Sequence, residues 1–329
     1  MTGLSDSFQR PINYLRISVT DRCNLRCIYC MPEGEISTLS HRDILTYEEI
    51  CTVVKAAAEL GIKKVRLTGG EPLVRLGLTD LIRMLAEIDA IDDISLTTNG
   101  TLLGHYAAEL KSAGLHRVNI SLDTLKPDRF ESITRTRGRS LSDVLRGIDT
   151  ARSVGLNPVK LNMVVMAGIN ADEVLDFAMR TINDGWHVRF IELMPVTDGE
   201  TAASLFVSAG DIRKRLEVVG ELEPCLPGVG NGPAKYFRFP GAPGTIGFIT
   251  PISEHFCFNC NRLRLTADGR LRPCLLSEYE VDLKQPLRGG VSLAGLKQLI
   301  EEAVANKPRR HHLEEGYVLR DRPFTQVGG

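Results

Sequence analysis

Short apolar runs that suit β-strands alternate, over the first two thirds of the chain, with segments whose apolar residues recur at helical spacing. The strand-like runs are Tyr14–Val19, Lys64–Thr68, Asp93–Thr97, Arg117–Leu122, Val159–Val165 and Val188–Leu193. The helical segments are Thr46–Leu60, Thr79–Ile88, Leu102–Ala113, Leu141–Val154 and Ala171–Asn183. Strands that alternate with helices form parallel sheets. The pattern therefore predicts an α/β fold, a partial TIM-like (β/α)6 barrel, although a doubly wound sheet fits the same order.

Each predicted strand also has two different faces, because successive side chains point to opposite sides of a sheet. One face is apolar and suits packing against helices, as Val65 and Leu67 illustrate. The other face is polar and carries three cations, Arg16, Arg66 and Lys160. Since a closed barrel is normally filled by branched apolar side chains, these positions predict an open lumen that holds a polar ligand. Buried polar networks or solvent-facing strand ends would give the same pattern.

The pattern changes after about residue 223, where frequent Gly and Pro exclude long helices. Arg262–Thr266 and Arg270–Cys274 predict a hairpin that turns at Ala267-Asp268-Gly269. Ser292 is a suitable N-cap for a last helix that reaches about Ala305. We therefore predict a barrel domain over residues 1–223, with a flexible segment at 1–13, and a second domain of short strands, loops and a helix over 224–329.

Composition narrows the classes of function. The 329 residues include 40 Lys and Arg and 41 Asp and Glu, for a net charge of −1. A chain so close to neutral lacks the broad positive surface that binds nucleic acid or an anionic membrane. No apolar run is long enough to span a membrane and the N-terminus has no apolar signal segment, so we expect a cytoplasmic protein. Basic side chains are then expected to act locally.

Six of the eight cysteines fall into two triplets. They are Cys23, Cys27 and Cys30, directly after the first predicted strand, and Cys257, Cys260 and Cys274 in the C-terminal third. In a reducing compartment this grouping favours metal centres over disulfides. A four-iron cluster takes four ligands, so three thiolates leave one iron free for another molecule. Core packing or zinc would also explain the first triplet, and a zinc site on the second could recruit His255 or Cys225.

Arg262 and Arg264 follow the second triplet and project from one face of a predicted strand. Guanidinium groups suit two-point binding of phosphate. In isolation, such a pair is usually just a solvated strand edge. Beside a metal site in a nearly neutral chain, the pair suggests a phosphate site.

The spacing Cys23-x3-Cys27-x2-Cys30, with Tyr29 before the third cysteine, resembles the radical S-adenosylmethionine (SAM) superfamily. The segment Arg66-Leu67-Thr68-Gly69-Gly70-Glu71-Pro72 resembles the glycine-rich segment of the same superfamily. The resemblance implies a [4Fe-4S] cluster whose open iron binds SAM. It also implies that one electron from this cluster cleaves SAM to a 5′-deoxyadenosyl radical.

With both triplets and a C-terminal Gly-Gly, the chain resembles over nearly its whole length the MoaA family, the GTP 3′,8-cyclases of molybdenum cofactor biosynthesis. The resemblance implies two [4Fe-4S] clusters, the second with an open iron that meets guanine. It implies a SAM pocket of Tyr29, Gly70, Ser121 and Met194. It implies a GTP site of Arg16, Arg66, Thr97, Lys160, Arg262, Leu263 and Arg264. Catalytic roles are implied for Cys23, Cys27, Cys30, Arg262 and Arg264, and metal ligation for Cys23, Cys27, Cys30, Cys257, Cys260 and Cys274.

The resemblance further implies a reaction and partners. The radical removes the 3′ hydrogen of GTP, and C3′ attacks C8 to give (8S)-3′,8-cyclo-7,8-dihydroguanosine 5′-triphosphate. A flavodoxin- or ferredoxin-type electron donor, the next-step enzyme MoaC and a homodimer are implied, with no nucleic acid and no membrane. Gly328-Gly329 is expected to insert into the active site, although most chain ends simply fray. A peptide maturase with an auxiliary cluster and a non-enzymatic metal or redox protein remain the alternatives.

Overall fold

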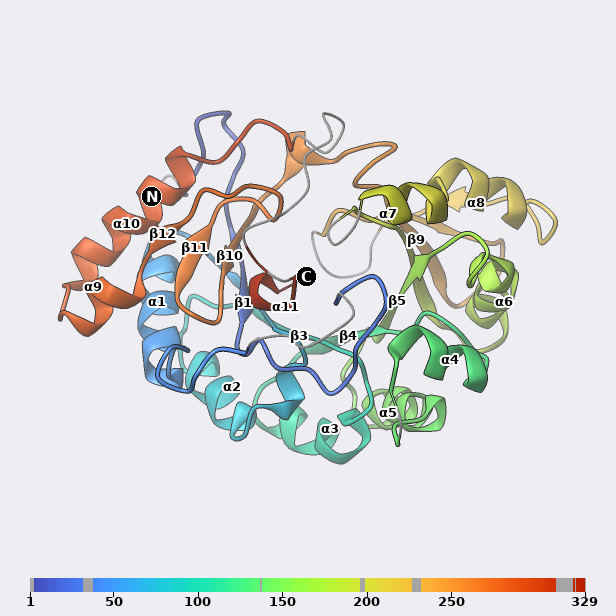
Figure 1. Ribbon diagram of the computed structural model, residues 1–329, viewed down its shortest axis with the longest axis horizontal. Helices are drawn as coiled ribbons and strands as arrows, with labels where there is room; N and C mark the ends of the chain where they lie inside the picture. Colours follow the sequence, from blue (N-terminus) through green and yellow to red (C-terminus); the bar gives the residue numbers. More distant parts are fainter. Residues whose placement is uncertain are drawn as a thin grey trace.

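The computed structural model describes residues 3–31, 38–136, 138–195, 199–226, 232–311, 322 and 324–328. Its strands are β1 (Tyr14–Ser18), β2 (Lys64–Thr68), β3 (Asp93–Thr98), β4 (Arg117–Ser121), β5 (Lys160–Val165), β6 (His187–Glu192), β7 (Glu223–Pro224), β8 (Lys235–Arg238), β9 (Thr245–Ile249), β10 (Arg262–Leu265), β11 (Arg270–Arg272) and β12 (Val281–Asp282). They form a 12-stranded sheet in the order β12-β11-β10-β1-β2-β3-β4-β5-β6-β9-β8-β7. The sheet curves around a central space without closing (Figure 1), which confirms the predicted partial barrel.

Most of the helices cover the outer face of this sheet (Figure 1). The helices are α1 (Tyr47–Glu59), α2 (Leu78–Ala86), α3 (Leu103–Ser112), α4 (Pro127–Thr134), α5 (Leu141–Ser153), α6 (Val174–Asn183), α7 (Gly199–Leu205), α8 (Ala209–Leu216), α9 (Lys284–Arg288), α10 (Leu293–Ala305) and α11 (Phe324–Val327), of which α11 lies at the centre of the barrel. The 3-10 turns are η1 (Pro72–Val74), η2 (Ala171–Glu173) and η3 (Cys257–Asn259). Among the described residues, no helix is both long and apolar enough to cross a membrane.

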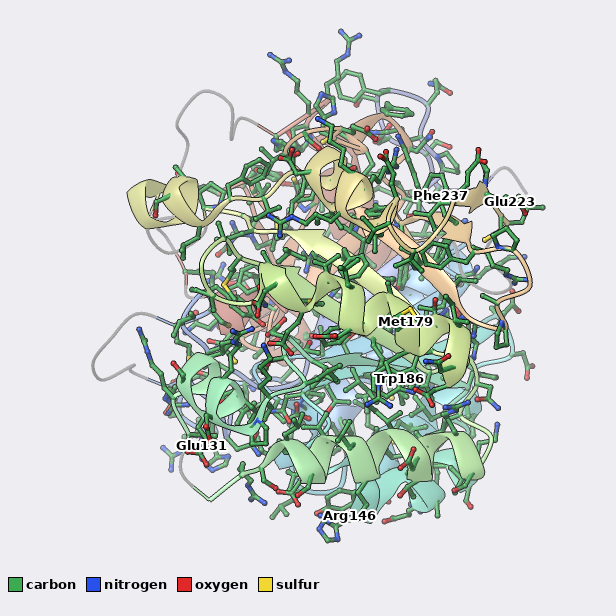
Figure 2. All side chains as sticks on the ribbon, turned by 90° about the vertical axis from the view of Figure 1, so that its right-hand side faces the viewer. Glu131, Arg146, Met179, Trp186, Glu223 and Phe237 are labelled. Atoms are coloured by element: carbon green, nitrogen blue, oxygen red, sulfur yellow. The ribbon has the colours of Figure 1, made fainter. Side chains whose placement is uncertain are left out.

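The strand faces divide as the alternation predicts. Val65 and Leu67 are fully buried in the core between sheet and helices. Trp186 is buried beside α6. The Arg180 guanidinium lies 5.5 Å from the centre of the Trp186 ring. Figure 2 shows Trp186 between Arg146 of α5 and Met179 of α6. Burial of apolar surface stabilises the fold by roughly 25 cal/mol per Å². Because the apolar face of each strand is buried under the helices, the polar face must point toward the lumen.

Local signals place the predicted helices correctly. Thr46 and Glu49 form a reciprocal capping box at the start of α1. The Ser292 hydroxyl accepts a hydrogen bond from the Gly295 amide at the start of α10, which ends at Ala305 as predicted. The predicted hairpin is present as β10 and β11, which pair antiparallel. Helices α4, α7, α8, α9 and α11 lie outside the predicted segments, and each is short.

The C-terminal third joins the sheet of the barrel at two places. Strand β10 runs parallel to β1, and β9 runs parallel to β6. Residues 224–311 therefore extend both sides of the same sheet. The division into domains 1–223 and 224–329 stays a prediction, and in space the two segments share one layer.

The segment we expected to be flexible at residues 1–13 is held against the barrel in its described part. Ile12 is buried, and its amide donates to the Leu4 carbonyl oxygen at 2.8 Å. Arg10 is also buried and forms an ion pair with Asp6. Its guanidinium donates further to the carbonyl oxygens of Cys257, Pro308 and Arg309. Three separate parts of the chain meet at this side chain, a contact that no local pattern predicts.

Candidate active site

The first cysteine loop lies on top of the glycine-rich segment. The Gly70 amide donates to the Thr20 carbonyl oxygen, and the Glu71 amide donates to that of Arg22, both at 2.8 Å. A Cβ added at Gly69 or at Gly70 would lie 2.4 Å from a backbone oxygen of the loop. Only glycine therefore permits this close approach of two backbones.

Glu71 ties the same segment to the end of β3. Its carboxylate is fully buried and accepts hydrogen bonds from the Leu73 amide at 3.0 Å, the Thr98 hydroxyl at 2.7 Å and the Asn99 amide at 2.6 Å. Burial raises the pKa of Glu71 to about 7. The glycine-rich segment is thus fastened on two sides, which fixes the platform for the cysteine loop.

The three cysteines of the first set are half-buried neighbours. Burial raises the pKa of Cys23 to about 11 and that of Cys30 to about 12. Burial, Cys30 and Asp123 raise the pKa of Cys27 well above its ordinary range. Three neighbouring thiols that oppose one another's ionisation need a strong positive charge to become ligands, and a bound iron cluster would supply one. The donor set therefore fits a [4Fe-4S] cluster.

Tyr29 connects the first cysteine loop to the lumen. Its hydroxyl donates to Asp123 at 2.7 Å, and Asp123 also accepts from the Val164 amide at 2.8 Å. Burial raises the pKa of Asp123 to about 6. Tyr29, Ser121 and Asp123 line both a small cavity beside Cys27 and the larger cavity of the lumen.

The lumen contains a cavity of about 250 Å³ that Cys257, Cys260 and Cys274 line directly. Cations surround this second set. Lys307, itself buried, donates to the carbonyl oxygens of Arg262 and Pro273. Burial alone raises the pKa of Cys260, but the charges of Arg262 and Lys307 outweigh it and lower this pKa to about 6. One thiol of the set is thus ready to ionise at neutral pH, which suits a metal ligand.

A row of guanidinium groups crosses the same cavity. The strand register places Arg264, Arg16 and Arg66 at one level on β10, β1 and β2. All three line the cavity, as does Arg189 of β6. Burial and neighbouring Arg262 lower the pKa of Arg264 to about 9. Closely spaced buried cations are costly, and an anionic ligand offsets that cost.

The partners of these arginines support an anion site. Arg66 donates to the Ser95 hydroxyl at 3.2 Å, and Arg189 donates to the Asn119 side-chain oxygen. Arg264 donates to the carbonyl oxygen of Gly328. Within the described ranges, none of these three guanidinium groups forms an ion pair with a carboxylate. Their charge is left to a ligand.

The C-terminal tail reaches into the lumen beside Arg264. Helix α11 lies against β1 at the centre of the barrel (Figure 1). A Cβ at Gly328, whose φ is +68°, would lie 2.6 Å from the Thr68 methyl group, so glycine is required here. Gly329, the second glycine of the expected motif, lies outside the described residues.

Most of the residues expected to bind SAM or GTP meet at the lumen cavity. It is lined by Tyr29, Ser121, Met194, Arg16, Arg66, Thr97, Arg262 and Arg264. Gly70 does not line it and instead supports the cysteine loop. The Leu263 side chain is buried in the core on the opposite face of β10, so only its backbone can meet a ligand there. Lys160 lines another cavity, because it is the first residue of β5.

Sequence reasoning missed Arg189. It occupies the lumen face of β6 beside Asn162 of β5. The alternation within the sixth strand was the available signal, since Arg189 stands two residues before Ile191 on the same face.

Comparison with known proteins identifies two families that together match most of this chain. Residues 17–180 match the family "Radical SAM superfamily", and residues 186–313 match "Molybdenum Cofactor Synthesis C". A protein of Pelotomaculum thermopropionicum named GTP 3′,8-cyclase is 55% identical over 99% of this chain and 100% of its own. A Moorella thermoacetica protein of the same name is 52% identical, again over 99% of this chain and 100% of its own.

The chain belongs to the GTP 3′,8-cyclase family. The crystal structure of Streptococcus suis SuiB bound to its precursor peptide SuiA shares the fold, with a TM-score of 0.52 and 18% identity over 63% of this chain and 45% of that one. Since its identity is so low, that likeness concerns the fold alone.

The structure also shows whether acidic, histidine and cysteine side chains converge on a site for a single metal ion. In the described part of the chain, no three His, Cys, Asp or Glu side chains converge closely enough to hold a single metal ion. The Cys225 backbone amide donates a hydrogen bond to the Tyr236 carbonyl oxygen, beside the β7–β8 pair. It does not complete the second set, whose thiols have one another, Lys307 and Arg262 as charged neighbours.

Proposed function

We propose that this chain is a radical SAM enzyme that converts GTP to (8S)-3′,8-cyclo-7,8-dihydroguanosine 5′-triphosphate, an early step of molybdenum cofactor biosynthesis. The observation that carries the proposal is the row formed by Arg264, Arg16 and Arg66. These cations cross a cavity that also meets the second cysteine set and Tyr29 of the first cysteine loop. A triphosphate beside two three-thiol sites is the ligand that this cavity suits best.

The first cysteine loop provides for SAM. Cys23, Cys27 and Cys30 would hold one [4Fe-4S] cluster, and Tyr29, Gly70, Ser121 and Met194 would surround SAM. When bound and reduced, this pair supplies a 5′-deoxyadenosyl radical. The chain's own part is to hold the loop rigid, which the Gly69-Gly70 contact and the Glu71 hydrogen bonds do.

The lumen provides for GTP. Arg16, Arg66 and Arg264 would bind the triphosphate, with Thr97, Arg262 and the Leu263 backbone as further contacts. Cys257, Cys260 and Cys274 would hold a second [4Fe-4S] cluster that binds the guanine base. With both ends of the nucleotide fixed, C3′ and C8 are kept in one reactive conformation, and the apolar wall of Ile191, Ile249 and Leu276 excludes water.

Turnover with different substrates tests the proposal. The protein is reconstituted and reduced without oxygen, then given SAM with GTP, ATP or a peptide. We expect 5′-deoxyadenosine and the cyclised nucleotide with GTP only. Equal SAM cleavage with all three substrates would reject the cyclase, and a modified peptide would favour the maturase.

We also propose partners that the reaction requires. A flavodoxin- or ferredoxin-type donor would supply electrons, and MoaC would receive the product. A homodimer and a cytoplasmic location complete the proposal, and the free state of all eight cysteines agrees with a reducing compartment.

A further inference from the structure

A second cavity, of about 470 Å³, lies at the amino-terminal ends of β5, β6 and β9. Lys160, His187 and Thr245 are neighbours in the strand register at this level. Two residues further along, Asn162 and Arg189 line the lumen cavity instead. The second cavity therefore opens at the end of the barrel opposite to the cysteine loops, and none of the six clustered cysteines lines it.

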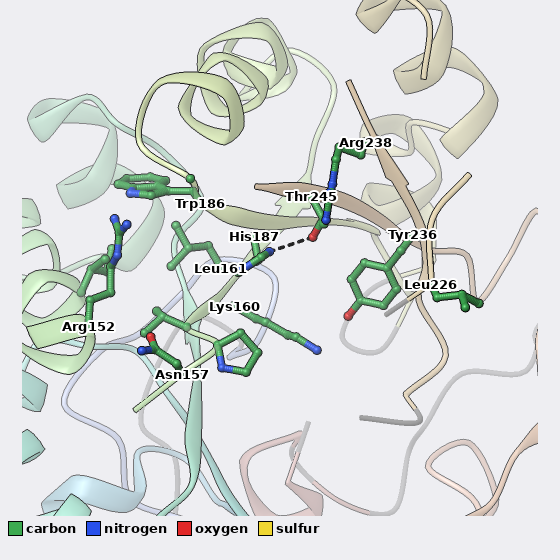
Figure 3. Close-up of a pocket in the computed structure, with 14 residues that line it drawn as sticks. Arg152, Asn157, Lys160, Leu161, Trp186, His187, Leu226, Tyr236, Arg238 and Thr245 are labelled. Atoms are coloured by element: carbon green, nitrogen blue, oxygen red, sulfur yellow. Dashed lines mark hydrogen bonds between the residues drawn. The ribbon is translucent and has the colours of Figure 1, made fainter. Parts of the chain in front are cut away.

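Charge distinguishes this cavity. Its described lining holds four basic side chains and no carboxylate: Arg152, Lys160, His187 and Arg238. Figure 3 shows Arg152 on one side and Arg238 on the other, with His187 and Lys160 between them. The His187 Nδ1 lies 2.9 Å from the Thr245 hydroxyl, which fixes the ring.

The two arginines of this cavity form no ion pair with nearby acids in the described part of the chain. Arg152 donates to the carbonyl oxygen of Asp184 at 2.9 Å, whereas the Asp184 carboxylate pairs with Arg180. Arg238 faces Glu223 across the β7–β8 pair. As far as the structure describes the chain, neither Arg152 nor Arg238 forms an ion pair with any carboxylate. The charge of these two guanidinium groups is therefore available to a ligand.

Apolar and aromatic groups form the remaining walls. Tyr236 places its ring beside Lys160, whose Nζ lies 5.2 Å from the ring centre. Trp186, Leu161 and Leu226 add apolar surface. The volume falls within the range of small-molecule sites, and a few convergent charges over an apolar wall are typical of them.

We propose that this cavity is a second ligand site, which binds a phosphate-bearing small molecule of about nucleotide size separately from the GTP of the lumen. Arg152 and Arg238 take the phosphate from two sides, and the Tyr236 ring offers a face to a planar group. The proposal does not depend on the cyclisation reaction, because it uses no cysteine and no lumen arginine.

Titration calorimetry of the reconstituted protein tests it, with pyrophosphate and GDP as probes after one equivalent of GTP has been added to fill the lumen. Pyrophosphate alone reports phosphate recognition, and tighter binding of GDP reports the aromatic wall. We expect Arg152→Gln/Arg238→Gln to weaken pyrophosphate binding at least about tenfold, since each variant removes charge-assisted hydrogen bonds. The matched control, Arg83→Gln/Arg146→Gln, removes the same charge from exposed ion pairs on α2 and α5 and is expected to leave binding unchanged.

Two results would overturn the proposal. One is the absence of pyrophosphate binding to the GTP-loaded protein. The other is binding that Arg264→Ala abolishes and Arg152→Gln/Arg238→Gln does not affect, because the anion would then occupy the lumen. Arg238→Gln alone repeats the test in a variant whose fold is least disturbed, because Arg238 is the exposed last residue of β8.

Discussion

The two cysteine sets each offer three thiols but have different charged neighbours. Around the first set, burial raises the thiol pKa values, and the buried acids Asp123 and Glu71 are close charged neighbours. Around the second, burial also raises the pKa of Cys257 and Cys274, but the charges of Arg262 and Lys307 lower the pKa of Cys260 to about 6. The first site thus depends on its metal for charge, whereas the second is built into a cationic cavity that also suits a nucleotide. This contrast supports the proposal that SAM binds at the first site and substrate at the second.

The largest expected effect comes from removing one thiol at each site. Cys27→Ser should abolish SAM cleavage, because the first cluster loses a ligand. Cys260→Ser should leave some SAM cleavage but no cyclised product. Iron content, 5′-deoxyadenosine and nucleotide products are measured in parallel, with Cys51→Ser as control for a buried thiol outside both sets. Equal loss of both reactions in the two variants would remove the proposed division of labour.

The next effect concerns thiol reactivity in the cluster-free protein. At pH 7 a thiol with a pKa near 6 is mostly thiolate, whereas one near 11 is ionised on the order of 10⁴-fold less. We expect iodoacetamide to label Cys260 with a midpoint near pH 6, and Cys23 only in strongly alkaline solution. Mass spectrometry of the labelled peptides gives both profiles.

Lys307→Met sharpens this test. The variant keeps the length of the side chain and loses its charge, so the labelling midpoint of Cys260 should move to higher pH. The midpoint of Cys23 should not move. A common midpoint for both thiols in the unmodified protein would contradict the electrostatic contrast itself.

Substrate binding should respond to the arginine row without any change in metal. Arg264→Ala removes one of the buried cations of the lumen, and GTP affinity should fall by about tenfold or more. Arg270→Ala, on the neighbouring β11, breaks only ion pairs with Glu280 and Asp282 and serves as control. Loss of iron from Arg264→Ala would show that this arginine supports the cluster instead.

The smallest effect is on stability at the first site. Glu71→Gln places an amide N–H against the Asn99 amide, and the free energy of unfolding should fall by about 1–3 kcal/mol. Because burial raises the folded pKa of Glu71 from 4.5 to about 7, the folded protein binds an extra proton between these pH values. Stability therefore falls as pH rises through this window, and Glu71→Gln should remove that slope. Denaturant unfolding across the window is the measurement, with the exposed Glu131→Gln as control; an unchanged slope would contradict the assignment.

The local sequence pattern was enough to predict the partial barrel and several residues of the candidate site. Alternation placed Arg16 and Arg66 on the lumen face, and register then aligned them with Arg264. It placed Lys160 on the same face, but only the structure shows that this residue lies at the far end of its strand. Strand alternation gives the face of a residue and not its depth.

Other features depend on contacts between distant segments. Arg10 meets the Cys257 loop across 247 positions of sequence, and Lys307 meets Arg262 across 45. Neither side chain belongs to a periodic pattern or a motif. The charge around the second cysteine set, which separates it from the first, is therefore a property of the tertiary fold.

The central claim is that this chain holds the ribose of GTP for removal of its 3′ hydrogen. Reduced, reconstituted protein is given SAM and GTP labelled with deuterium at C3′, and the 5′-deoxyadenosine is analysed by mass spectrometry. The account predicts that the deuterium appears in 5′-deoxyadenosine together with cyclised nucleotide. Unlabelled 5′-deoxyadenosine, formed at the same rate without GTP, would contradict it.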